Sequence, residues 1–123
     1  LSLETDLEPI GFLELLNKLN SKNITINYDV GNSAALGYDP AEELNIYGDR
    51  ISDIHIKDRK RRGGPVILGT GDADFHGFFD ALDKIDYTGP FIMQAYRDEE
   101  GVAIFKSQLD WFKNKLSGHL VSD

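Results

Sequence analysis

The chain has 123 residues, and 13 Lys and Arg stand against 21 Asp and Glu, which gives a formal net charge of −8 at pH 7. A chain of this length makes about one small domain, and its acidity argues against nucleic acid or an anionic membrane as the main partner, because both require a broad basic face. Zero cysteines exclude disulfides and thiolate metal sites and fit a cytoplasmic protein. No apolar stretch approaches the roughly 18 residues that a membrane span requires.

In chain order, the apolar residues predict four repeats of a short strand followed by an amphipathic helix. Two of the helices have clear boundary signals: Pro9 suits a first turn, and Asp39 and Gly48 suit the N-cap and the end of the second helix. The predicted strands are residues 1–5, 23–30, 51–57 and 91–96, and the predicted helices are residues 9–20, 40–47, 75–84 and 99–116. This alternation, without hairpin signals, predicts an α/β fold with a parallel sheet.

Two architectures fit four consecutive strand–helix units: a small open sheet covered on both faces, or half of a (β/α)8 TIM barrel. A complete barrel needs about 250 residues, and this chain has 123. Four parallel strands alone would leave two bare sheet edges, which is a liability. A half-barrel would therefore need a missing N-terminal half or a second copy of the chain, and we expect that it does not stay monomeric. The first residue, Leu1 rather than Met, fits a piece of something longer.

Polar residues on one face of the predicted strands form a candidate metal site. The four are Glu4, Asp29, His55 and Gln94, one near the end of each strand. In a barrel this face meets the lumen, so these side chains would converge near the C-terminal rim, where barrel enzymes keep their chemistry. Two carboxylates, an imidazole and an amide oxygen suit Mn²⁺, Mg²⁺ or Co²⁺ better than structural zinc. The alternative is a row of hydrogen-bonded rim residues without a metal.

Five segments, LSLET, YDVGN, HIKD, LGTGDADF and GPFIMQAYRD, resemble the C-terminal half of the xylose isomerase-like TIM barrels. The similarity is to the sugar-phosphate isomerase and epimerase branch, which includes the L-ribulose- and L-xylulose-5-phosphate 3-epimerases and the hexulose-6-phosphate isomerases. It covers residues 1–123 as one domain equivalent to strands five to eight. The resemblance implies an isomerase or epimerase that works through an enediolate, with Glu4 as a general base. It also implies that one divalent metal is bound by Glu4, Asp29, His55 and Gln94.

Gln94 departs from the pattern of the family, in which the matching residue is a glutamate that acts as the second base. The resemblance implies a two-base 3-epimerisation. Gln94 argues against this reaction, because an amide cannot accept a proton. A one-base aldose–ketose isomerisation with Glu4 stays open, and Glu99 or Glu100 in the following loop offer other carboxylates. The amide should also weaken metal binding.

The resemblance further implies a sugar or sugar phosphate as the ligand, with four residues near its oxygens. They are Asn32, Lys57, Arg61 and Arg97. The basic run 59–62 and the glycines after it suit a phosphate site, because such barrels often bind phosphate with the loop after strand seven. The alternatives are structural: a solvated basic loop for 59–62, a lumen salt bridge for Lys57, a turn for Asn32 and a local ion pair for Arg97.

Three functions were weighed on these grounds. The first is a metal-dependent sugar or sugar-phosphate isomerase or epimerase. The second, which Gln94 favours, is a non-catalytic or incomplete half-barrel that binds a metal or a sugar phosphate. Abasic-site endonucleases share the barrel, but they need a histidine-rich three-metal cluster, and three histidines in an acidic chain argue against that function.

Overall fold

The computed structural model describes residues 1–97, 99 and 101–122. Its strands are β1 (Ser2–Leu3), β2 (Thr25–Asp29), β3 (Ile51–Ile56), β4 (Asp58–Arg59), β5 (Pro65–Val66) and β6 (Phe91–Met93). Its helices are α1 (Pro9–Leu19), α2 (Val30–Leu36), α3 (Pro40–Tyr47), the 3₁₀ turn η1 (Gly48–Arg50), α4 (Phe75–Ile85) and α5 (Val102–Ser122). Among the described helices, none combines the length and apolar character needed to cross a membrane.

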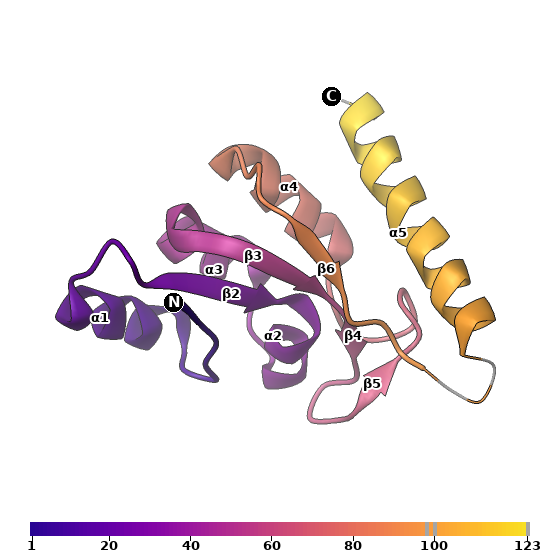
Figure 1. Cartoon of the computed structure of the whole chain (residues 1–123), viewed down its shortest axis with the longest axis horizontal. Coiled ribbons are helices and arrows are strands. Elements are labelled where there is room, and N and C mark those ends of the chain that lie inside the picture. The colour runs from indigo at the N-terminus through magenta and orange to yellow at the C-terminus, as the bar shows by residue number, and fades with distance from the viewer. Residues whose placement is uncertain (98, 100, 123) are drawn as a thin grey trace.

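Four strands form one parallel sheet in the order β1-β2-β3-β6, so β1 and β6 are its outer strands. Figure 1 shows β2, β3 and β6 side by side, with helices packed around them. In the register of β2 and β3, Asn27 lies beside Asp53 and Asp29 beside His55. Partners in adjacent parallel strands point to the same side of the sheet, so these four polar side chains share one face. The predicted α/β fold with parallel strands is confirmed.

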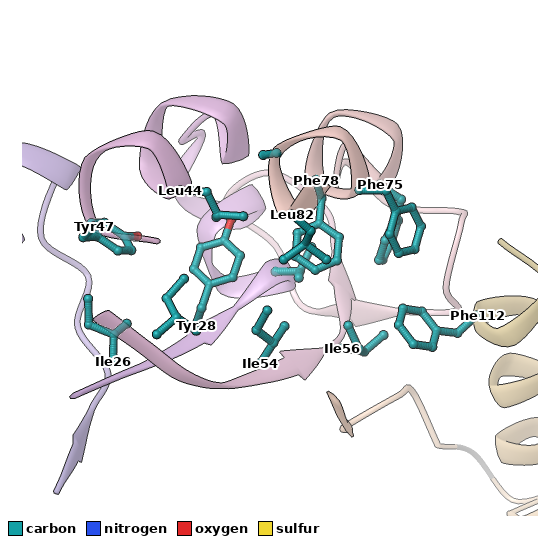
Figure 2. Close-up of a cluster of buried hydrophobic side chains, with 14 of the residues drawn as sticks. Ile26, Tyr28, Leu44, Tyr47, Ile54, Ile56, Phe75, Phe78, Leu82 and Phe112 are labelled. Atoms are coloured by element: carbon teal, nitrogen blue, oxygen red, sulfur yellow. The ribbon is translucent and has the colours of Figure 1, made fainter. Parts of the chain in front are cut away.

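The other face of the sheet carries the hydrophobic core. Ile26 and Tyr28 of β2 and Ile54 and Ile56 of β3 are at most 2% exposed, and they lie beneath α3 and α4 in Figure 2. The ring of Tyr28 stacks on that of Phe78 in α4, with ring centroids 6.1 Å apart. Each such side chain contributes about 1.5–3 kcal/mol by leaving water. The period-two alternation that assigns Asn27 and Asp29 to the opposite face thus agrees with the packing.

Helix α5 covers the side of α4 and β6 through aromatic contacts. Phe112 lies 5.8 Å from Phe79 of α4 and 5.4 Å from Phe91 of β6, measured between ring centroids. Trp111 meets the edge of Phe75 at 5.1 Å. The last helix (Figure 1) is therefore part of the same core as the sheet.

The strand–helix pattern misses the helix α2 and the strand pair β4–β5. Helix α2 begins directly after β2, where Asp29 accepts a hydrogen bond from the backbone N–H of Asn32 at 2.8 Å, and it ends at Gly37, whose φ is +81°. Strands β4 and β5 pair antiparallel, so the expectation of a chain without hairpins is wrong at this point. Each of the two has only two residues, which is too short for alternation to reveal.

The outer strands are also shorter than predicted, because β1 ends at Leu3 and β6 at Met93. An outer strand has a partner on one side only, so its ladder ends sooner. Glu4 and Gln94 therefore follow their strands instead of lying within them. The backbone N–H of Gln94 still donates to the carbonyl of Ile56 at 3.0 Å, which continues the path of β6 beside β3.

Glu43 of α3 is a carboxylate inside the packed layer of helices. It is 2% exposed and accepts hydrogen bonds from the hydroxyls of Tyr28 (2.9 Å), Ser33 (2.7 Å) and Tyr47 (3.0 Å). Burial raises the pKa of Glu43, and these hydrogen bonds oppose that shift only in part. Burial also raises the pKa of Tyr28 and of Tyr47, so both phenols remain proton donors at neutral pH.

Glu43→Gln should make the protein relatively more stable as the pH rises. Because the pKa of Glu43 is raised on folding, its contribution to stability is complete below the ordinary value of 4.5 and is lost as the pH rises through the raised value. The amide has no such titration and can still accept from and donate to hydroxyls. In urea unfolding at pH 4 and pH 7, the free energy of unfolding of the variant minus that of the wild type should increase with pH. The exposed neighbour Glu42→Gln is the control, and a difference independent of pH would contradict the prediction.

Asp58 organises the long loop between β4 and α4. Its side chain is fully buried, and it accepts hydrogen bonds from the backbone N–H groups of Gly69 and Gly71 (2.9 Å each) and of Ala73 (3.1 Å). A Cβ atom on Gly71 would collide with the Asp58 carboxylate, so this close approach requires glycine. One carboxylate thereby fixes residues 69–73, which lie between β5 and α4.

Asp58→Ala should lower the free energy of unfolding by about 3–5 kcal/mol, because it leaves three backbone donors without their acceptor. Asp58→Asn should also destabilise the protein, since the amide nitrogen would face N–H donors. Thermal and urea unfolding of both variants measure this loss. The exposed Asp110→Ala on α5 is the matched control and should change stability by less than about 0.5 kcal/mol. A loss below about 0.5 kcal/mol in Asp58→Ala would contradict the role of this carboxylate in the loop.

Candidate functional site

The four predicted ligands lie at the C-terminal ends of four neighbouring strands. Glu4 follows β1, Asp29 ends β2, His55 lies near the end of β3, and Gln94 follows β6. Asp29 and His55 are direct register partners, whereas Glu4 follows Leu3, the partner of Ile26, and so falls two residues nearer the start of β2 than Asp29. Gln94 falls beyond the end of β3. The tilted strands of a parallel barrel produce a stagger of this kind. The row therefore follows the rim that a closed barrel would have.

Glu4 is held by two amide side chains. Its Oε1 accepts a hydrogen bond from Nδ2 of Asn32 at 2.6 Å, and its Oε2 accepts one from Nδ2 of Asn27 at 3.3 Å. Glu4 itself is exposed, so these bonds are what orients its carboxylate. Glu4 lines a cavity of about 580 Å³ together with Asn32, Arg59 and Arg62.

Asp29 has a structural contact on each carboxylate oxygen. Oδ1 accepts from the backbone N–H of Asn32 at 2.8 Å, which caps α2, and Oδ2 lies 3.8 Å from Nζ of Lys57. Burial raises the pKa of Asp29, and the Asn32 N–H and the Lys57 ammonium oppose the shift. An additional positive charge beside this carboxylate would favour its ionised form further.

His55 lies near a carboxylate on its own strand. Its Nε2 lies 3.6 Å from Oδ2 of Asp53, and Oδ1 of Asp53 accepts hydrogen bonds from the hydroxyls of Ser2 and Ser52, both at 2.8 Å. The other ring nitrogen, Nδ1, is buried and has no hydrogen-bond partner among the described residues. A histidine with one nitrogen toward a carboxylate and the other unpaired has the arrangement of a metal ligand.

The donor set fits a divalent metal in its chemistry. The buried Nδ1 of His55 lacks a partner, and the carboxylate of Asp29 extends from the register position beside it. In the part of the chain that the structure describes, however, no three His, Asp or Glu side chains are already grouped around a common point. To bind the same metal, the carboxylate of Glu4, which follows the neighbouring strand β1, would have to reach toward Asp29 and His55. In the structure this carboxylate is hydrogen-bonded to Asn32 and Asn27.

Lys57, Gln94 and Arg97 line one cavity of about 530 Å³ on the β6 side of the row. Lys57 also makes the ion pair with Asp29, so the lumen salt bridge weighed for this residue is present. Gln94 and Arg97 are exposed. Glu99 is exposed as well, and Glu100 lies outside the described residues.

Arg61 lies apart from the other predicted substrate-binding residues. Its guanidinium packs against Gly37 and lines a cavity of about 290 Å³ together with Asp72 and Asp74. Its neighbour Arg59 points instead toward the metal-ligand row: Nη1 donates to Oδ1 of Asn32 at 2.8 Å. The basic run is thus divided between two cavities.

Two contributors were not singled out from the sequence, Asn27 and Asp53, and Arg59 was expected only as part of the basic run 59–62. Asn27 and Asp53 share the polar face with Asp29 and His55, so their alternation phase is a signal that could have identified them. Arg59 contacts Asn32 across 27 residues of sequence, and no local pattern reports such a contact.

The family comparison and the sequence relatives agree with this geometry. The family model of the xylose isomerase-like TIM barrels matches residues 8–115. An L-ribulose 3-epimerase of Methylomonas sp. strain DH-1 is 32% identical over 79% of this chain and 32% of its own length. An inosose dehydratase of Geobacillus kaustophilus is 31% identical over 76% of this chain and 37% of its own length. The chain thus spans about a third of the length of these relatives.

Solved structures share the fold. A xylose isomerase domain protein of Planctomyces limnophilus has a TM-score of 0.77 and 25% identity, over 94% of this chain and 44% of that one. The IolI protein, whose crystal structure contains a zinc atom, has a TM-score of 0.73 and 18% identity, over 88% of this chain and 43% of that one. The strand order, the row of residues at the strand ends and the family model lead to one conclusion: the chain belongs to the xylose isomerase-like TIM barrel family.

Proposed function

We propose that this chain carries half of the active site of a metal-dependent sugar or sugar-phosphate isomerase or epimerase, with Glu4 as the catalytic base. The observation that carries the proposal is the row at the strand ends. There the unpaired Nδ1 of His55 lies beside Asp29, and Glu4 is held by amides one strand away. The Methylomonas relative, an L-ribulose 3-epimerase, supports a sugar as the substrate class.

Glu4, Asp29, His55 and Gln94 would hold the metal. A bound Mn²⁺, Mg²⁺ or Co²⁺ would polarise the sugar carbonyl and stabilise negative charge on its oxygens. Glu4 would take the proton from the carbon next to the carbonyl, which leaves an enediolate, and would return that proton to the neighbouring carbon. The hydroxyl proton on the carbon that loses its hydrogen would pass to the former carbonyl oxygen, so protons and charge balance and Glu4 ends as the carboxylate it began as.

The remaining residues would bind the substrate. Lys57 and Arg97 line the cavity next to Gln94, where cations would meet sugar or phosphate oxygens. Asn32 and Arg61 complete the proposed set. The other half of the barrel, from another segment or a second copy of the chain, would supply the opposite wall of the lumen.

Gln94→Glu should convert a one-base site into a two-base site. With a carboxylate at this position, 3-epimerisation of a ketopentose or its 5-phosphate in the presence of Mn²⁺ should rise about 100-fold, which is the lower range for one general base. Aldose–ketose isomerisation should change much less. Proton NMR of the products and deuterium incorporation at C3 measure both reactions. The proposal fails if neither wild type nor variant exchanges any carbon-bound proton, and the two-base role fails if epimerisation is unchanged.

A second function, binding without catalysis, is favoured by two observations. Gln94 replaces a base with an amide, and no ready group of three acidic or histidine ligands occurs among the described residues. Calorimetry with Mn²⁺ and a pentulose phosphate separates the two functions when it is combined with a turnover assay. Binding without turnover favours the second function, and turnover of any ketose phosphate excludes it.

A further inference from the structure

A chain of hydrogen bonds joins the basic loop to Glu4. Nη1 of Arg59 donates to Oδ1 of Asn32 at 2.8 Å, and Nδ2 of Asn32 donates to Oε1 of Glu4 at 2.6 Å. The three residues come from β4, α2 and the end of β1 and line the same cavity. The backbone N–H of Asn32 is bonded to Asp29 at 2.8 Å. Asn32 thus connects two proposed metal ligands with one arginine.

The direction of these bonds follows from the chemistry of the groups. A guanidinium can only donate, and a carboxylate can only accept. The Asn32 amide therefore has to turn its oxygen to Arg59 and its nitrogen to Glu4. The reversed amide would place N–H groups against the guanidinium and a carbonyl against the carboxylate, and both contacts are repulsive. Arg59 makes the amide of Asn32 a donor toward Glu4.

Arg59 is itself held in a fixed direction. Its Nε donates to the carbonyl of Gly63 at 2.9 Å, and its backbone carbonyl accepts from the N–H of Asp72 at 2.9 Å. The planar fork of the guanidinium meets Gly63 with one nitrogen and Asn32 with another. A lysine ammonium on a flexible stem cannot hold both contacts in this geometry.

We propose that Arg59 is a positioning residue for the catalytic base: acting through Asn32, it fixes the rotamer and the location of the Glu4 carboxylate. The inference rests on the proposed function of Glu4. Glu4 is exposed, and an exposed glutamate without partners samples many rotamers. Loss of the arginine would lower the fraction of molecules in which the base faces the substrate carbon.

Arg59→Lys and Asn32→Asp test this inference, with Lys113→Gln as the control. Lys113 is exposed on α5, and its substitution removes one positive charge away from the strand ends and from Asn32. Arg59→Lys keeps the charge and should lower kcat by about 10- to 100-fold, as loss of a partner behind an active-site group does. KM for the sugar should stay within about twofold, because orientation of the base is not needed for binding. Asn32→Asp keeps the acceptor for Arg59 but opposes Glu4, so its loss should be at least as large.

A second readout does not depend on turnover. The side-chain amide signal of Asn32 in ¹H–¹⁵N NMR spectra should lie downfield in the wild type, because of its short bond to a carboxylate. It should move toward the signals of exposed amides in Arg59→Lys and in Glu4→Ala and remain in place in Lys113→Gln. An unmoved signal in Arg59→Lys, or a kcat equal to that of the wild type, overturns the inference. If the Asn32 amide signal shifts as expected but neither the wild type nor any variant turns over a sugar, the proposed function is wrong and the positioning of Glu4 by Arg59 is still supported.

Discussion

Glu4→Gln should lower turnover of the sugar substrate by about a thousandfold, within the range of 10²–10⁴ that a general base supplies. The amide has the shape of the carboxylate, and its one oxygen can still accept the 2.6 Å bond from Asn32. Its nitrogen cannot replace the acceptor of the longer 3.3 Å bond from Asn27, but Glu4 is exposed, so the fold should be kept. What it loses is the ability to take a proton. The measurement is the rate of deuterium exchange from solvent into the carbon next to the carbonyl, together with kcat.

Glu14→Gln is the matched control, because Glu14 is exposed on α1 and away from the strand ends. It should retain full activity. The role of Glu4 would be contradicted by a Glu4→Gln variant that keeps more than about a tenth of wild-type exchange. A loss of folding in that variant, seen by circular dichroism, is not expected, because Glu4 is exposed.

His55→Ala should weaken the binding of Mn²⁺ by at least about 100-fold. The substitution removes the buried Nδ1 that has no partner among the described residues, and it leaves Asp29 with Lys57 as its neighbour. Calorimetric titration of Mn²⁺ with and without a pentulose phosphate measures the change. In the wild type the sugar phosphate should strengthen binding, because its oxygens would add ligands to the same ion.

His76→Ala is the control for this titration, since His76 is an exposed residue of α4 whose Nε2 lies 3.4 Å from Asp80. Equal Mn²⁺ affinity in the wild type and in His55→Ala would remove His55 from the site. Absence of binding in the wild type would instead indicate that the ligand row needs the opposite half of the barrel to assemble.

Local sequence patterns were sufficient for the class of fold. The alternation that buries Ile26 and Tyr28 and turns Asn27 and Asp29 to the other face is a property of the strand itself, whose side chains repeat every two residues. The same holds for α3, where Asp39 accepts from the N–H of Ala41 at 3.0 Å as the predicted N-cap. These features depend on neighbours within a few residues, so the sequence reports them directly.

Such local patterns do not reveal short helices and strands. Helix α2 has seven residues and β4 and β5 have two each, which is less than the window in which a period can be recognised. Helix α2 had other signals, namely a capping aspartate and a following glycine at positive φ. The segment after β5 is held by hydrogen bonds to Asp58 from residues 11 to 15 positions further along the chain, a separation that no local pattern covers.

The parallel α/β architecture and the row of polar residues at the strand ends can be predicted from periodicity and strand order. The atoms of that row that are engaged are known only from the packing of the folded chain. In the folded chain, Lys57 forms an ion pair with Asp29, and Nδ1 of His55 has no partner among the described residues. Arg59, rather than Arg61, bonds to Asn32, which in turn bonds to Glu4. These outcomes depend on how separate strands and loops pack in space, and hydrogen bonds over 27 or 28 residues leave no trace in a local pattern.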